Sequence, residues 1–255
     1  MNDGMMTYHW NTLYIVLSVV IAISTSFFAL ELARRLRLSD PLWASLSLGG
    51  VLGYGIWAMH FIGMIAMQLP TNVAFRLPLT ALSGVLAIGF LVAASVFMFR
   101  GKATLLRILG SGVIAGTGIC LMHYLGMAAL EINAVSSYRP VPFAVSVLIA
   151  VGAATVAFFL FSRVMTTAFS FSARIAVQIG AALTMGVAIA GMHYTGMAAV
   201  QFMPSVNNIG NQVSGTDPQN LVYLIVGVTL VVFVATYIFI LADQLSSRSA
   251  GAATD

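Results

Sequence analysis

The sequence predicts an all-α fold: a seven-transmembrane helix bundle built from three parallel two-helix repeats plus a seventh helix. Three observations lead to this prediction. Of the 255 residues, 60% are hydrophobic and only 7% are charged, whereas a soluble domain carries about 25% charged residues. Seven apolar stretches are long enough to cross a bilayer core, which takes about 20 residues of helix. A six-residue motif recurs in the second, fourth and sixth of these stretches.

The seven stretches define the expected elements in chain order. We place the spans at residues 12–33, 42–69, 77–99, 105–132, 141–162, 175–202 and 221–243. The second, fourth and sixth are the longest, and their glycine, alanine and serine content favours close helix–helix contact in lipid. A polar segment with two prolines, residues 203–220, is expected as a loop before the last span. We expect one membrane domain over residues 1–245, and over 246–255 a small, polar segment that is either a cytoplasmic tail or the start of a linker.

Basic residues between the spans predict the orientation of the chain, because loops with the excess of Lys and Arg face the cytoplasm. One side of the predicted bundle holds nine of them: Arg34, Arg35, Arg37, Arg100, Lys102, Arg107, Arg163, Arg174 and Arg248. The other side holds only Arg76 and Arg139, so we expect the N-terminus outside and the C-terminus in the cytoplasm. Glu31 stands one turn before Arg35, which predicts an ion pair at the cytoplasmic end of the first span.

Charge and cysteine content limit the kinds of partner and site that this chain can have. The formal net charge of +4 does not indicate nucleic acid, because the basic residues flank apolar spans, and the lipid bilayer is the expected partner. The first ten residues lack a positive region and no small-residue cleavage site follows the first span, so we expect no cleaved signal peptide. The single cysteine, Cys120, excludes an intramolecular disulfide and a cysteine-only metal site.

The motif reads Met-His-aromatic-x-Gly-Met and occupies residues 59–64, 122–127 and 192–197. It contains three of the chain's four histidines. A histidine inside a membrane span is costly and faces the bundle interior, a partner or a ligand. The three motif-bearing spans run in the same direction, and each histidine lies past the midpoint of its span. We therefore expect His60, His123 and His193 to converge at one depth, near the axis that relates the repeats.

The residues around these histidines indicate a metal site. A methionine follows each histidine by four residues, on the same helix face: Met64, Met127 and Met197. The glycine between them leaves space on that face. The leading methionines lie beside the histidines, where they either reach a neighbouring helix's site or pack in the core: Met59, Met122 and Met192. Imidazole and thioether together favour copper, particularly Cu(I), whereas three imidazoles alone also suit zinc.

Two further residues and one simpler interpretation remain open at this stage. Cys120 lies three residues before His123 on the same face, so it is a candidate for an additional soft ligand in one repeat. His9 precedes the first span on the outer side, where it would either cap the site from above or, as we expect, be solvated. Without a metal, the methionines would fill gaps in the core and each histidine would bond a neighbouring carbonyl.

At these motifs the sequence resembles the MHYT family of bacterial integral-membrane sensor domains. Residues 192–195, Met-His-Tyr-Thr, match the name-giving tetrapeptide, while residues 59–62 and 122–125 keep Met-His-aromatic and depart at the fourth position. The resemblance implies a sensor in the bacterial inner membrane that works through copper and senses a diatomic gas, O2, CO or NO. It also implies a cytoplasmic output module or partner protein, such as a cyclic-di-GMP synthase or phosphodiesterase. We expect no such module within this chain, and hence no enzyme activity of its own.

Other functions fit the motif less well. A transition-metal transporter needs ligands strung across the membrane, and the inner halves of the motif-bearing spans offer few. A haem-binding membrane protein with two histidine ligands is a further alternative. An enzyme with a tri-histidine zinc site lacks a nearby acid or base in this sequence. The oligomeric state is left open, a homodimer included.

Overall fold

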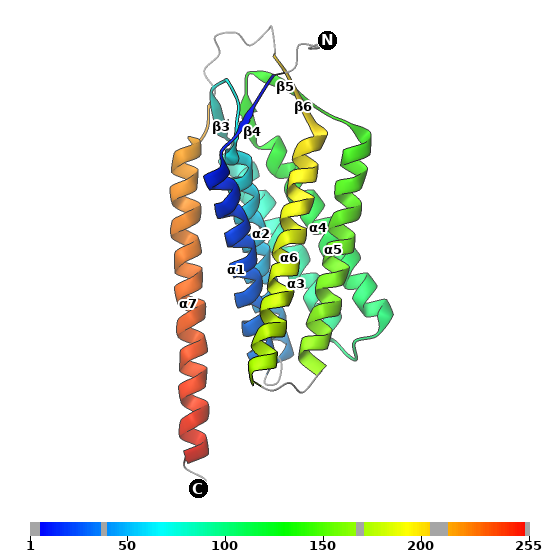
Figure 1. Cartoon of the computed structure of the whole chain (residues 1–255), viewed down its shortest axis with the longest axis vertical. Coiled ribbons are helices and arrows are strands. Elements are labelled where there is room, and N and C mark those ends of the chain that lie inside the picture. Colours follow the sequence, from blue (N-terminus) through cyan, green and yellow to red (C-terminus); the bar gives the residue numbers. More distant parts are fainter. Residues whose placement is uncertain (1–5, 37–39, 167–170, 205–213, 253–255) are drawn as a thin grey trace.

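A computed structural model describes residues 6–36, 40–166, 171–204 and 214–252. Within these ranges the chain forms seven helices, each long and apolar enough to cross a membrane, which confirms the predicted fold class (Figure 1). They are α1 (Thr12–Leu36), α2 (Pro41–Ala66), α3 (Leu77–Phe99), α4 (Leu105–Ala128), α5 (Pro140–Thr166), α6 (Phe171–Ala199) and α7 (Pro218–Ala252). The last helix continues beyond residue 243 into the expected tail. Residues 205–213 of the expected loop, and Arg37, lie outside the described residues.

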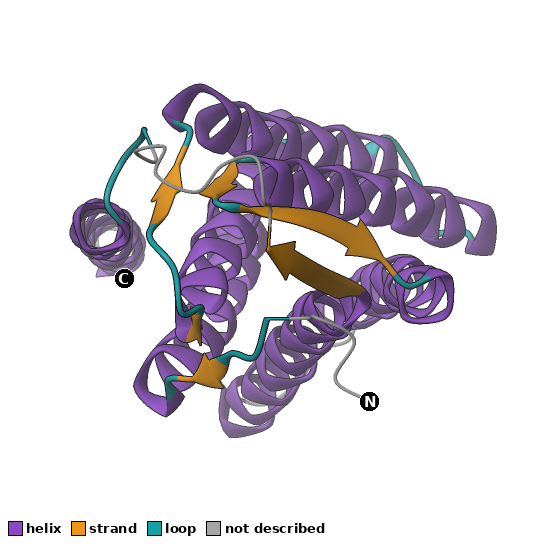
Figure 2. Cartoon of the chain, turned by 90° about the horizontal axis from the view of Figure 1, so that it is seen from above, coloured by secondary structure: helices purple, strands orange, loops and turns teal. Residues whose placement is uncertain are grey.

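Six short strands lie at the end of the bundle nearest the N-terminus, which we call the strand end (Figures 1 and 2). They are β1 (His9–Trp10), β2 (Met67–Gln68), β3 (Val73–Phe75), β4 (Leu130–Ile132), β5 (Ala134–Tyr138) and β6 (Val200–Pro204). The strands pair antiparallel as β1–β2, β3–β4 and β5–β6. Each repeat therefore runs strand, helix, helix, strand, and its two strands pair with each other.

The helices that carry the motifs end earlier than predicted. We expected the second, fourth and sixth spans to reach residues 69, 132 and 202, but α2, α4 and α6 end at Ala66, Ala128 and Ala199. The apolar residues beyond these points belong to the strand ladders, where the partner strand satisfies their backbone groups. Hydropathy does not separate the two structures, because the run of apolar side chains continues from helix into strand.

The three motif helices are capped in the same way at the strand end. The residue before the odd-numbered helix of each repeat donates its backbone N–H to a carbonyl at the end of the even-numbered helix: Asn11 to Ala66 (2.8 Å), Arg76 to Ala129 (2.9 Å) and Arg139 to Ala199 (2.8 Å). The guanidinium groups of Arg76 and Arg139 donate to the carbonyls of Ala128 (2.6 Å) and Ala198 (3.0 Å). The last carbonyls of a helix have no partner within it. These two arginines therefore stabilise helix ends on the side where basic residues are few.

Helices α1 to α6 form a closed ring in chain order, with α6 returning to α1. Each motif helix approaches the first helix of the next repeat through a glycine: Gly53 lies against Ile88 of α3, Gly116 against Val151 of α5 and Gly186 against Ile23 of α1. A Cβ at any of the three would overlap with the neighbouring backbone. This is the close contact through small residues that the sequence predicted.

The seventh helix stands outside the ring, against α1 and α2 (Figure 2). The Tyr54 hydroxyl of α2 donates to the Ile225 carbonyl (3.0 Å) and lies 2.9 Å from the Thr229 hydroxyl. Arg35 of α1 donates to Asp243 (2.6 Å) and to Glu31 (2.6 Å). The Glu31–Arg35 pair was predicted, whereas its extension to α7 was not. Contacts near both ends therefore fasten α7 to the ring.

The orientation of the bundle can be tested by reporter fusions. The basic bias predicts that the C-terminal end of α7 faces the cytoplasm. Alkaline phosphatase joined after Asp255 should therefore be inactive, and green fluorescent protein at the same place should fluoresce. An active phosphatase fusion at this position would reverse the predicted orientation.

Candidate metal centre

The three motif histidines meet inside the ring near its strand end. His60, His123 and His193 lie on α2, α4 and α6, within the last two turns of each helix. Their side chains are fully buried, with at most 1% of the residue surface exposed. The similar helix ends and the glycine contacts set the three helices at corresponding heights. The convergence expected from the topology is thus present in the structure.

The Nδ1 atoms of the three imidazoles point toward one another. Nδ1 of His60 lies 3.1 Å from Nδ1 of His193 and 3.2 Å from Nδ1 of His123. The candidate ligand atoms of the three residues all lie within 4.8 Å of one another, and no other group of three His, Cys, Asp or Glu residues in the described ranges does so. Nitrogen lone pairs at such distances repel unless a proton or a cation lies between them. Three nitrogens about 2.0 Å from one ion would be about 3.3 to 3.5 Å apart, so the observed spacing fits a shared metal ion.

The Nε2 atoms point outward, each against the motif glycine of another repeat. His60 packs on Gly126, His123 on Gly196 and His193 on Gly63, so the three contacts form a closed cycle through α2, α4 and α6. A Cβ at any of these glycines would overlap with Nε2 of the facing histidine. The sequence predicted that the glycine leaves space, and the structure shows that an imidazole from another repeat fills it.

None of the three Nε2 atoms has a hydrogen-bond partner within the described residues. A neutral imidazole that binds a metal through Nδ1 carries its proton on Nε2. The ring orientation turns Nδ1 of all three histidines toward the interior of the ring, where His60 lies within hydrogen-bond distance of the other two. Three inward-facing imidazole nitrogens are a donor set that a metal ion such as copper or zinc accepts.

The motif aromatics have a structural role that the sequence analysis did not assign. The Tyr194 hydroxyl lies 2.9 Å from that of Ser18 on α1, and the Tyr124 hydroxyl lies 2.6 Å from that of Ser146 on α5. Each bond joins a motif helix to the first helix of the next repeat. In the remaining copy, Phe61 has no hydroxyl and packs edge-on against Phe75 of β3. The recurring aromatic in the third motif position was the signal for this role.

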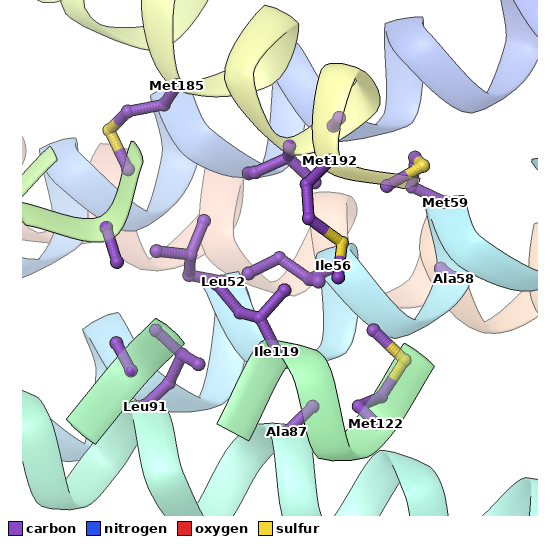
Figure 3. Close-up of a cluster of buried hydrophobic side chains, with 14 of the residues drawn as sticks. Leu52, Ile56, Ala58, Met59, Ala87, Leu91, Ile119, Met122, Met185 and Met192 are labelled. Carbon is purple, nitrogen blue, oxygen red and sulfur yellow. The ribbon is translucent and has the colours of Figure 1, made fainter. Parts of the chain in front are cut away.

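All six motif methionines are buried, with at most 4% of their surface exposed. Met59, Met122 and Met192 belong to the apolar cluster of Figure 3. Met64 lines a pocket near the strand end with Tyr14 and Phe75. Ligation by these sulfur atoms stays a prediction, as does ligation by the histidines. Two other residues lie outside the histidine group: Cys120, which is half-buried, and His9, which is exposed on β1.

Substitution of a motif glycine tests the cycle of histidine contacts. Gly196→Ala places a methyl group against His123, and overpacking of this kind costs about 1–3 kcal/mol. Gly191→Ala on the same helix meets open space, and removing a helical glycine there should stabilise by about 0.5–1 kcal/mol. Thermal unfolding of the metal-free protein in detergent should therefore rank Gly196→Ala below Gly191→Ala. Equal stability of the two variants would mean that Gly196 does not seat the imidazole.

Comparison with known proteins agrees with this architecture. The MHYT family, described as a bacterial signalling protein N-terminal repeat, matches residues 53–111, 116–178 and 186–253, and each matched segment contains one motif. The bifunctional diguanylate cyclase/cyclic di-GMP phosphodiesterase MucR of Pseudomonas aeruginosa is 38% identical over 250 residues, which cover 96% of this chain and 36% of MucR. The signaling protein YkoW of Bacillus subtilis is 36% identical over 199 residues, 76% of this chain and 24% of YkoW.

A third relative is the cyclic di-GMP phosphodiesterase NbdA of Pseudomonas aeruginosa, 37% identical over 190 residues, which cover 73% of this chain and 24% of NbdA. The chain thus spans roughly a quarter to a third of the length of these relatives. No solved structure matches it. With three family repeats over most of its length and seven membrane helices, the chain is a multi-pass membrane protein that belongs to the MHYT family of bacterial signalling proteins.

Proposed function

We propose that this chain senses a diatomic gas through one copper ion held by His60, His123 and His193. The observation that carries the proposal is the convergence of their Nδ1 atoms at 3.1 and 3.2 Å in a fully buried position. Intramembrane ionisable residues mark functional sites. Three such residues from three repeats, oriented alike, support a common ligand more strongly than they support separate packing roles.

The chemistry of the surroundings supports copper. No aspartate, glutamate or cysteine joins the three imidazoles within the described residues, and each histidine is followed one turn later by a buried motif methionine. Imidazole and thioether are ligands that copper accepts, whereas Mg, Ca and Mn prefer oxygen. When bound, Cu(I) with three protein ligands supplies an open position at which a small gas binds. The helices shield the three imidazoles from water, since the histidines are buried on all sides.

The protein can transmit a change at this site through its own contacts. The three histidines lie on three different helices, so any change in their separation displaces α2, α4 and α6 relative to one another. Helix α2 carries both His60 and Tyr54, and Tyr54 bonds to α7 at Ile225 and Thr229. Movement of α2 therefore acts on α7, which leads to the C-terminus. The relatives' names support a cyclic-di-GMP enzyme as the output that α7 would control.

The geometry gives less support to the alternatives. Haem iron with two histidine ligands takes them on opposite faces of a planar macrocycle, and Nδ1 atoms 3.1 Å apart leave no room for a plane between them. Metal transport requires a series of metal ligands between the histidines and the opposite end of the bundle. Four residues before the histidines, in that direction, stand Ile56, Ile119 and Ile189, whose side chains offer no metal ligand.

Single histidine substitutions test the shared site. His60→Ala, His123→Ala and His193→Ala should each lose most of the bound copper, because a three-imidazole site without one ligand is incomplete. Elemental analysis of the purified protein measures this directly. His9→Ala is the matched control, since His9 is exposed and lies outside the group. Copper contents equal to wild type in all three variants would refute a shared site.

The choice between copper and zinc depends on the methionines. Replacing Met64, Met127 and Met197 with leucine changes side-chain volume little, so the fold should persist. The triple variant should lose affinity for Cu(I), because the soft thioethers are gone, and keep whatever zinc affinity the histidines give. Competition against a Cu(I) chelator tests this. If Cu(I) affinity does not change, these methionines are packing residues and the case for copper weakens.

A further inference from the structure

A cavity of about 40 Å³ lies inside the ring, next to the histidines on the side away from the strand end. All six ring helices contribute to its wall, and every residue that lines it is apolar. Figure 3 shows Leu52, Ile56, Ile119 and Met192 approaching one another from α2, α4 and α6 in this region. The cavity therefore lies on the axis that relates the repeats.

Residues at equivalent positions of the three repeats line the cavity, and the histidines also occupy equivalent positions in these repeats. Ile56, Ile119 and Ile189 each precede a motif histidine by four residues, and they form the layer that separates cavity from imidazoles. Four residues of helix rise about 6 Å, so the cavity begins one turn from the candidate metal centre. It is thus next to the site and on the same axis.

The layer of side chains one turn further from the histidines explains why a cavity exists. Leu52, Ala115 and Met185 each precede a histidine by eight residues. Ala115 is far smaller than its two counterparts, and it faces the alanine-rich wall of α5, where Ala150 and Ala154 are also buried. Three large side chains would close this layer. One small side chain among them leaves space on the axis.

We propose that this cavity binds a small apolar gas molecule and holds it beside the three histidines. Apolar cavities of this kind stay dry and bind molecules such as xenon. Roughly 10 to 15 Å³ suffices for one molecule the size of water, so a cavity of about 40 Å³ has room for a diatomic gas. Ions and water find no polar partner on its wall. The gas as physiological ligand rests on the proposed function, whereas the binding of an apolar atom here does not.

The surroundings of the bundle favour such an occupant. O2, CO and NO are small and weakly polar, and they dissolve in the hydrocarbon that surrounds the seven helices. Between a molecule in the cavity and the imidazoles lie the isoleucine layer and Met192, which also lines the cavity. Side-chain rotation is fast compared with motions of whole helices. The cavity thus acts as a reservoir from which the centre is filled without opening the strand end to water.

Xenon binding to the full chain in detergent, followed by 129Xe NMR without added metal, tests the proposal. Wild type should show a saturable site. Ala154→Leu fills the cavity and should lose it, whereas Ala144→Leu, at an exposed position on the same helix, should bind xenon as wild type does. Leu52→Ala enlarges the cavity and should strengthen binding, which keeps the test decisive if Ala154→Leu fails to fold. The absence of a saturable site in wild type, or undiminished binding by folded Ala154→Leu, would overturn the proposal.

The same samples separate this proposal from the copper hypothesis. The three His→Ala variants should keep xenon binding while losing copper, since the cavity wall contains no histidine. Ala154→Leu should keep its copper content and lose xenon. If wild type binds xenon but takes up no copper, the proposed metal centre fails and the gas cavity stands.

Discussion

Three imidazoles buried against one another set the requirements that the rest of this structure meets. The Nε2 edge of each ring needs space on a neighbouring motif helix. Gly63, Gly126 and Gly196 provide this space because they have no side chain. Each helix must also present its histidine at the same height. The strand ladders, the shared capping of the helix ends, and the glycine contacts between repeats fix that height. The three copies of the motif thereby bring their histidines together in one group with threefold order.

The sequence predicted the seven helices and the meeting of the histidines, because both depend on local pattern: apolar length, and the depth of the motif within it. It did not predict the occupant of the glycine space or the strands that end α2, α4 and α6. Both depend on which segment faces which, and an apolar run such as residues 200–202 suits helix and strand equally. The bond from Arg35 to Asp243 was missed for the same reason, since the partners are separated by most of the chain.

The two halves of the ring interior differ in chemistry. Near the strand end lie the imidazoles, with the motif tyrosines bonded to Ser18 and Ser146. Beyond the isoleucine layer the wall is apolar and incompletely filled. A buried group of imidazoles on one side and an apolar cavity on the other are consistent with the proposed binding of a small uncharged ligand. Helix α2 connects this interior to α7 through Tyr54, which gives a signal a direct path out of the ring.

The proposed function depends on one metal ion that binds all three imidazoles at once. X-ray absorption spectroscopy of the copper-loaded protein tests it most directly, because the fine structure reports the number and type of ligand atoms. A shared site should show one copper per chain with three imidazole nitrogens at about 2.0 Å, and with sulfur as any further protein ligand. A spectrum with fewer than three imidazoles, or a protein that takes up no stoichiometric metal, would contradict the account.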